Sequence, residues 1–267
     1  MPGSAKKHDI LTYPASRRAT FDVGRIGGRK HHIAGFLELD VTSAREKIRS
    51  EIKSGRAVSF NTWLIKVIGD TVAANSSIHA LNHRRNSQVA FHDVDISFPL
   101  EREVAGRKVP LAALVRGVNT KSLEEIHAEI RESLEKSIAS AKDFVLARRK
   151  GGGAMVLFFR LPGFLRRLVW KLLLRNPFSV KRNMGTVMVT NIGMAGHFPG
   201  WILPKSLHNL CFGIGSIVKK PWVVDGKVEV RDILHMTILF DHDAVDGVPA
   251  ARFTDALVKR IEGGTGL

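Results

Sequence analysis

The sequence is poor in the residues that define several classes of protein. Its 267 residues include one cysteine and one tyrosine, and a single cysteine cannot form a disulfide within the chain. That cysteine, Cys211, lies in the apolar run LCFGIGSIV, so we expect a small core residue in a reducing, cytoplasmic environment. A small secreted domain held together by disulfides is excluded.

Long hydrophobic runs are also missing. No run reaches the roughly 20 apolar residues needed to cross a bilayer, and the opening MPGSAKKHDILTYPASRR lacks the apolar core of a secretory signal. Hydrophobic residues nevertheless make up 44% of the chain, which is enough to build a real core. We therefore expect an intracellular protein that does not span a membrane.

Acidic residues are absent between Asp143 and Asp225, although thirteen Lys or Arg residues fall in that interval. The rest of the chain has 28 basic and 25 acidic residues, so this interval carries most of the net charge of +16. Such a region should face an anionic partner, namely a phosphate-bearing cofactor, a lipid head-group surface or nucleic acid.

Hydrophobic periodicity predicts one α+β domain built on a mixed sheet. The first thirty residues are polar, and Gly24, Gly27 and Gly28 should break any helix there, so residues 1–28 are expected to form a partly loose arm. Asp225-Gly226 predicts a hairpin turn. Strands are expected at 31–41, 89–100, 108–115, 185–193, 210–218, 221–230 and 233–240, and helices at 43–54, 59–75, 120–142 and from 249 onward.

The stretch FDHDAVDG, from Phe240 to Gly247, places a histidine and three aspartates directly after an apolar strand. Asp-Gly is an ordinary turn signal. Taken alone, this stretch indicates a solvated loop between a strand and a helix.

Several segments in order resemble the catalytic domain of the dihydrolipoyl acyltransferases of 2-oxo acid dehydrogenase complexes. FDHDAVDGVPAARFTDAL is similar to that family's terminal HxxxDG motif, and GTVMVTNIGMAG to its strand motif ending in a serine-asparagine pair and a glycine. The resemblance covers roughly residues 29–142 and 184–262. It implies an acyltransferase domain at 29–262 with a chloramphenicol acetyltransferase-like fold, a two-layer sandwich of a mixed β-sheet with flanking helices.

The resemblance also implies roles for five residues. His242 is expected to be the general base that deprotonates a thiol acceptor. Thr190 stands where the family has a serine that donates to the oxyanion, and threonine keeps the hydroxyl but stiffens χ1. Asn191 and Gly193 are the expected cofactor-binding positions. Asp246 belongs to the expected catalytic residues in a structural role: it should pair with an arginine, and this pair should fix the loop.

The partner arginine of Asp246 is open between Arg29 and Arg18. Coenzyme A or acyl-CoA is the implied substrate, no metal site is predicted, and the acyl chain is open.

The general base and the oxyanion donor come from adjacent subunits in this family, so a homotrimer or a multiple of three is implied. We expect a stand-alone core without a lipoyl attachment site, so a dihydrolipoyl acceptor would come from another protein; a small-molecule or lipid acceptor is equally open.

Residues 151–183 form an insertion where the family has a short polar loop. A helix from Phe164 to Arg175 would align Arg167, Lys171 and Arg175 beside a leucine-rich face, which is typical of an interfacial helix. Residues 154–176 are therefore expected either to bind an anionic membrane surface or to form a lid on the trimer. Nucleic acid is disfavoured because aromatic residues do not interleave with the charges. A catalytically dead scaffold and a membrane-surface module remain the alternative functions.

Overall fold

The computed structural model describes residues 17–104, 107–135, 161–193 and 199–267, together with His8, Tyr13 and Phe158. Two sequence predictions lie outside the described residues: the helix beyond residue 135 and the start of the insertion at 151–157.

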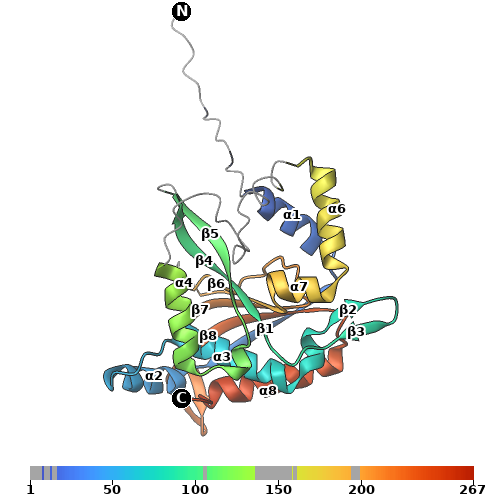
Figure 1. The fold of residues 1–267 in the computed structure, drawn as a ribbon. Helices are drawn as coiled ribbons and strands as arrows, with labels where there is room; N and C mark the ends of the chain where they lie inside the picture. Colours follow the sequence, from blue (N-terminus) through green and yellow to red (C-terminus); the bar gives the residue numbers. More distant parts are fainter. Residues whose placement is uncertain are drawn as a thin grey trace, which may run out of the picture.

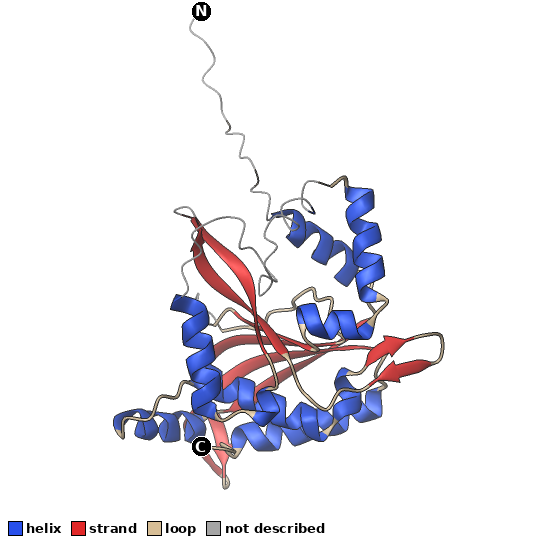
Figure 2. Ribbon diagram, viewed as in Figure 1, coloured by secondary structure: helices blue, strands red, loops and turns tan. Residues whose placement is uncertain are grey.

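A six-stranded mixed sheet is the centre of the molecule (Figure 2). Strands β4, β6 and β7 run parallel to one another, and the other neighbours are antiparallel. The α+β class and the mixed sheet predicted from the sequence are therefore confirmed. In spatial order the strands are β1 (His32–Asp40), β8 (Lys227–Asp241), β7 (Leu210–Val224), β6 (Val187–Asn191), β4 (Ile96–Val104) and β5 (Arg107–Val115).

Helices α2 (Thr42–Lys53), α3 (Phe60–Ala74), α4 (Leu123–Glu135) and α8 (Gly247–Glu262) lie on one side of the sheet (Figure 1). They enclose the main core, where Trp63, Phe212 and Phe253 are completely buried. A capping box begins α4, because Ser122 Oγ accepts from Glu125 N and the Glu125 carboxylate accepts from Ser122 N.

On the opposite side of the sheet lie α7 (Pro177–Met184) and the extended segment 199–208, with α1 (Arg17–Gly27) and α6 (Gly163–Leu174) farther from the strands (Figure 1). A Cβ atom at Gly213 would lie 2.9 Å from the Ile202 side chain, so glycine in β7 lets this segment approach the sheet closely. Two short strands, β2 (Leu81–His83) and β3 (Ser87–Val89), form a separate hairpin.

The prediction that the glycines break any helix in the arm at 1–28 is wrong, because residues 17–27 form α1. Asp22 of α1 is buried and binds Arg166 of α6 at 2.8 Å, with the two side chains only 8% and 12% exposed. Gly27 serves close packing, since a Cβ atom there would lie 2.6 Å from the Ser206 carbonyl oxygen. A tertiary ion pair thus outweighs the low helix propensity of the glycines.

The strand boundaries also differ from prediction at two places. Residues 89–100 were predicted as one strand, but β3 ends at Val89 and β4 begins only at Ile96. Residues 221–230 are not a separate strand: they are the tip of one long hairpin formed by β7 and β8. The predicted turn at Asp225-Gly226 is confirmed, with both residues at positive φ.

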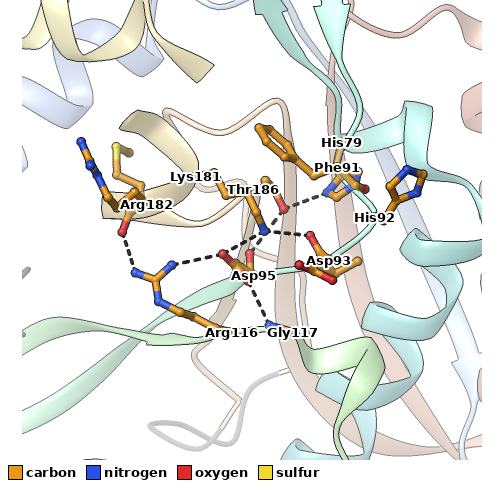
Figure 3. A network of polar contacts seen from close by, with 12 residues as sticks. His79, Phe91, His92, Asp93, Asp95, Arg116, Gly117, Lys181, Arg182 and Thr186 are labelled. Carbon is orange, nitrogen blue, oxygen red and sulfur yellow. Dashed lines mark hydrogen bonds and ion pairs between the residues drawn. The ribbon is translucent and has the colours of Figure 1, made fainter. Parts of the chain in front are cut away.

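A buried carboxylate, Asp95, joins α7 to the sheet (Figure 3). Its two oxygens accept from Gly117 N at 2.9 Å and bind Lys181 Nζ at 3.1 Å and Arg116 Nη1 at 3.2 Å. Its backbone carbonyl accepts from Thr186 N at 2.9 Å. The start of β4, the end of β5, the end of α7 and the start of β6 are therefore held at one point.

Two histidines are buried in the neutral form. His79 contacts Thr186 Oγ1 at 2.8 Å and the Phe91 carbonyl at 3.1 Å, and burial lowers its pKa to about 4. His208 contacts the Met184 carbonyl at 2.9 Å, and burial likewise lowers its pKa to about 4. Thr186 and Met184 belong to the segment that follows the insertion and leads into β6, so both imidazoles link this segment to the rest of the fold.

Acid should therefore destabilise the protein over a defined range. Between pH 6.5 and about pH 4, His79 and His208 are protonated in the unfolded chain but stay neutral in the folded chain, because burial lowers their pKa from 6.5 to about 4. The free energy of unfolding should fall as the pH drops through that window, by roughly 3 kcal/mol for each histidine. Urea unfolding from pH 7.5 to 4.5 measures this loss.

The matched variants are His79→Gln, which should remove about half of the pH dependence, and His92→Gln, which alters an exposed histidine and should leave it unchanged. An identical slope in the wild type and His79→Gln would contradict the assignment to His79.

Candidate active site

His242 is the first residue after β8, and its side chain is exposed. Its backbone N–H donates to the His31 carbonyl at 3.0 Å, which extends the pairing of β1 and β8 by one step. The Asp241 carbonyl accepts from Ala244 N and Val245 N and so closes the turn that follows. The imidazole is thus carried at the surface on a fixed backbone.

A buried ion pair anchors this strand end. Lys30 Nζ lies 2.5 Å from Asp241 Oδ2 and 2.6 Å from Asn209 Oδ1, and the Asp241 side chain is only 4% exposed. Asn209 also donates to the Ala80 carbonyl at 2.7 Å. The sequence analysis missed Lys30 and Asn209, because only the folded chain brings these distant positions together.

A second histidine flanks the loop. His31 Nδ1 lies 2.9 Å from Asp243 Oδ1, and this hydrogen bond raises the pKa of His31 and lowers that of Asp243. Both side chains are largely exposed. On the other side, Gln88 of the β2–β3 hairpin donates to the Ala244 carbonyl at 3.1 Å. The loop is therefore held from two elements besides its own strand.

Asp246 precedes the first residue of α8 and is exposed, and its side chain accepts no capping hydrogen bond. No ion pair between Asp246 and Arg29 is present within the described part of the chain. The predicted pairing with an arginine therefore stays a prediction.

The strand motif lies in β6. Thr190 is half-buried near the end of that strand. Asn191 accepts from Gly193 N at 2.9 Å and donates to Asn61 of α3 at 2.8 Å, so it ties the strand end to a helix. A Cβ atom at Gly193 would lie 2.1 Å from the Gly215 carbonyl oxygen, which explains why glycine occupies this turn.

Thr190 and His242 are far apart within one chain. Thr190 is in register with Gly213 of β7, and Gly213 with Thr237 of β8, five residues before His242. Five residues span about 16 Å along a strand and two strand spacings about 10 Å, a separation of roughly 19 Å. The two side chains of one chain cannot act on the same carbonyl group.

Metal ligands do not gather in the described residues: no group of three His, Cys, Asp or Glu side chains is placed to hold an ion. None of the described helices is long and apolar enough to cross a membrane.

Comparison with known proteins shows similarity to one acyltransferase family. Residues 181–266 match the model of the 2-oxoacid dehydrogenases acyltransferase (catalytic domain). The dihydrolipoyllysine-residue succinyltransferase component of the mitochondrial 2-oxoglutarate dehydrogenase complex of Bos taurus is 31% identical over 233 residues, 85% of this chain and 43% of that protein. The C-terminal part of the chain, residues 181–266, is thus similar to the catalytic domain of this acyltransferase family. The acetyltransferase component of the Zymomonas mobilis pyruvate dehydrogenase complex is 26% identical over 85% of this chain and 44% of its own length.

Solved structures show that the acyltransferase fold extends over nearly the whole chain. The dihydrolipoamide acetyltransferase of Azotobacter vinelandii has a TM-score of 0.69 at 20% identity, over 98% of this chain and 96% of that one. A probable dihydrolipoamide acetyltransferase from Listeria monocytogenes also has a TM-score of 0.69, at 17% identity, over 97% and 96%. The chain spans less than half the length of the two curated relatives.

The anchor beneath His242 can be tested by its contribution to stability. Lys30→Met should leave the buried Asp241 carboxylate without its cation and lower the free energy of unfolding by roughly 2–3 kcal/mol, because the Lys30 side chain is 20% exposed and partly screened. Urea unfolding at pH 7.5 measures the change. The matched control Lys259→Met breaks an exposed pair with Asp255 and should have little effect. Equal effects of the two substitutions would refute the anchoring role.

Proposed function

We propose that the protein catalyses acyl transfer between coenzyme A and a thiol acceptor, with His242 as general base. A nitrogen of the neutral imidazole takes the thiol proton while the sulfur attacks the acyl carbonyl. The tetrahedral intermediate then collapses, breaks the old carbon–sulfur bond, and the departing thiolate recovers the proton from the imidazolium. Thr190 donates a hydrogen bond to the intermediate's oxyanion.

The observation that carries this proposal is the placement and spacing of three residues. In the Azotobacter vinelandii enzyme, the residues whose catalytic roles were investigated are a serine, a histidine and an asparagine, separated by 52 and 4 positions. Thr190, His242 and Asp246 are separated by the same 52 and 4 positions. The hydroxyl and the imidazole are thus retained in type and position, and a carboxylate replaces the amide.

The separation of Thr190 from His242 leads to the assembly. Since the two side chains of one chain lie roughly 19 Å apart, a complete site needs His242 from one subunit and Thr190 from the next. A closed ring with such heterologous contacts brings one base and one donor together at each interface between subunits. We propose a trimer. Another structure with this fold, at a TM-score of 0.66, is the cubic core of the pyruvate dehydrogenase multienzyme complex.

We propose a dihydrolipoyl group as the thiol acceptor, because the curated relatives are named dihydrolipoyllysine-residue acyltransferases. Asn191 and Gly193 form the turn at the end of β6, next to the donor. We propose that this turn contacts the coenzyme A substrate.

The general base is tested by His242→Ala. Turnover of acetyl-CoA, propionyl-CoA and succinyl-CoA with dihydrolipoamide, followed by release of free coenzyme A thiol, should fall by about 100-fold or more. The exposed side chain makes no core contact, so thermal stability should be unchanged. His92→Ala, which removes another exposed histidine, is the control. Near-normal turnover of folded His242→Ala would refute the mechanism, and an inactive folded wild type would favour the scaffold alternative.

The oxyanion donor is tested by three substitutions at one position. Thr190→Ser keeps the hydroxyl and should retain activity, whereas Thr190→Val keeps the shape and should lose about 100-fold in turnover, as Thr190→Ala should. Equal turnover of the valine variant and the wild type would show that the hydroxyl is not the donor.

The shared site is tested by mixing subunits. Inactive His242→Ala and Thr190→Val chains, refolded together, should regain part of the activity because some interfaces then pair an intact base with an intact donor. Sedimentation should show a trimer or a multiple of three. An active monomer, or mixtures without any recovered activity, would contradict this arrangement.

A further inference from the structure

The helix of the insertion, α6, exposes an apolar stripe that the core does not use. The stripe is formed by Phe164, Leu168 and Leu172, which are 62%, 52% and 58% exposed, and Val169 beside it is 41% exposed. The positions are four residues apart and so lie on one line along the helix. The stripe is about 12 Å long, since each residue adds 1.5 Å.

A basic stripe runs next to the apolar one. Arg167, Lys171 and Arg175 each lie three residues after a stripe position, and all three are exposed. Within the described residues none of them forms an ion pair, whereas Arg166 on the inner side of α6 binds Asp22. The helix thus has one paired arginine on its inner side and three basic side chains that face solvent on its outer side.

The inner contacts fix which side of α6 faces outward. The ion pair between Arg166 and Asp22 holds α6 against α1, and Trp170 contacts Phe158 edge to face on a half-buried side of the helix. Figure 1 shows α6 at the periphery of the molecule with α1 on one side. Its exposed stripe therefore lies on the side of the helix opposite Arg166 and Trp170.

We propose that α6 docks the protein on an anionic membrane surface as an interfacial helix. Such helices bury an apolar face at the head-group boundary while Lys and Arg contact anionic lipids. Charge decides against a second copy of this chain as the occupant, because the net charge is +16 and the sequence is free of acidic residues from 144 to 224. Each docked basic residue gains attraction only from a negative surface.

The experiment measures partition of the full-length protein into vesicles by co-sedimentation. Phosphatidylglycerol-containing vesicles should bind the protein at low salt, pure phosphatidylcholine vesicles should bind far less, and added salt should weaken the binding. The charge variant combines Arg167→Gln, Lys171→Gln and Arg175→Gln and should partition roughly 100-fold more weakly. The apolar variant combines Phe164→Ser, Leu168→Ser and Leu172→Ser and should also lose binding.

A matched control removes three exposed basic residues from the opposite side of the sheet. Lys53→Gln, Arg252→Gln and Lys259→Gln, on α2 and α8, lower the net charge equally and should retain binding. Circular dichroism and thermal melting check each variant. Leu168→Glu replaces the apolar triple variant if that variant misfolds.

Four results would overturn the proposal. They are no binding to anionic vesicles at low salt, an equal loss in the control and charge variants, unchanged binding of the apolar variant, and dissociation of the assembly by the apolar substitutions. The last result would assign the stripe to a second copy of the chain. Acyl transfer is not part of the readout, so the vesicle result stands apart from the test of His242.

Discussion

The buried carboxylate of Asp95 is the constraint on which the arrangement of the site depends. A charge removed from water must be fully compensated, and here two cations and a backbone N–H bind its two oxygens. Its partners come from the end of β5 and from α7, and its backbone carbonyl accepts from the residue that precedes β6. These contacts fix where the chain re-enters the sheet after the insertion. They therefore also fix the register in which β6, which carries Thr190, pairs with β4.

The strands around the catalytic candidates are fixed by contacts of a different kind. The end of β8 is held by an ion pair with Lys30, and the end of β6 by the amide of Asn191 and the close approach of Gly193 to Gly215. The surrounding sheet is almost entirely apolar on its core face. Rigid positions for an exposed imidazole and a half-buried hydroxyl thus come from a few polar links set into a hydrophobic framework.

Local patterns in the sequence predicted much of the fold. The periodicity of α3, the capping box of α4 and the Asp-Gly turn of the β7–β8 hairpin are each encoded within a few neighbouring residues. The motif residues His242 and Thr190 could be recognised for the same reason. Helix α1, in contrast, contains two glycines that disfavour a helix, and its buried Asp22 is paired with Arg166, 144 positions away. Lys30 and Asn209 can be recognised only by their contacts with residues far away in the sequence, and hydrophobic periodicity does not reveal such pairs.

The ion pair between Asp22 and Arg166 has a practical consequence for any shortened version of this protein. A boundary drawn at residue 29, where similarity to the acyltransferases begins, would remove α1 and with it the only acidic side chain that contacts α6 in the described residues. The Arg166 guanidinium, now 12% exposed, would lose its counter-ion, and the inner side of an already amphipathic helix would be uncovered. A fragment of this kind would be prone to aggregate, so the first 28 residues belong with the domain in recombinant work.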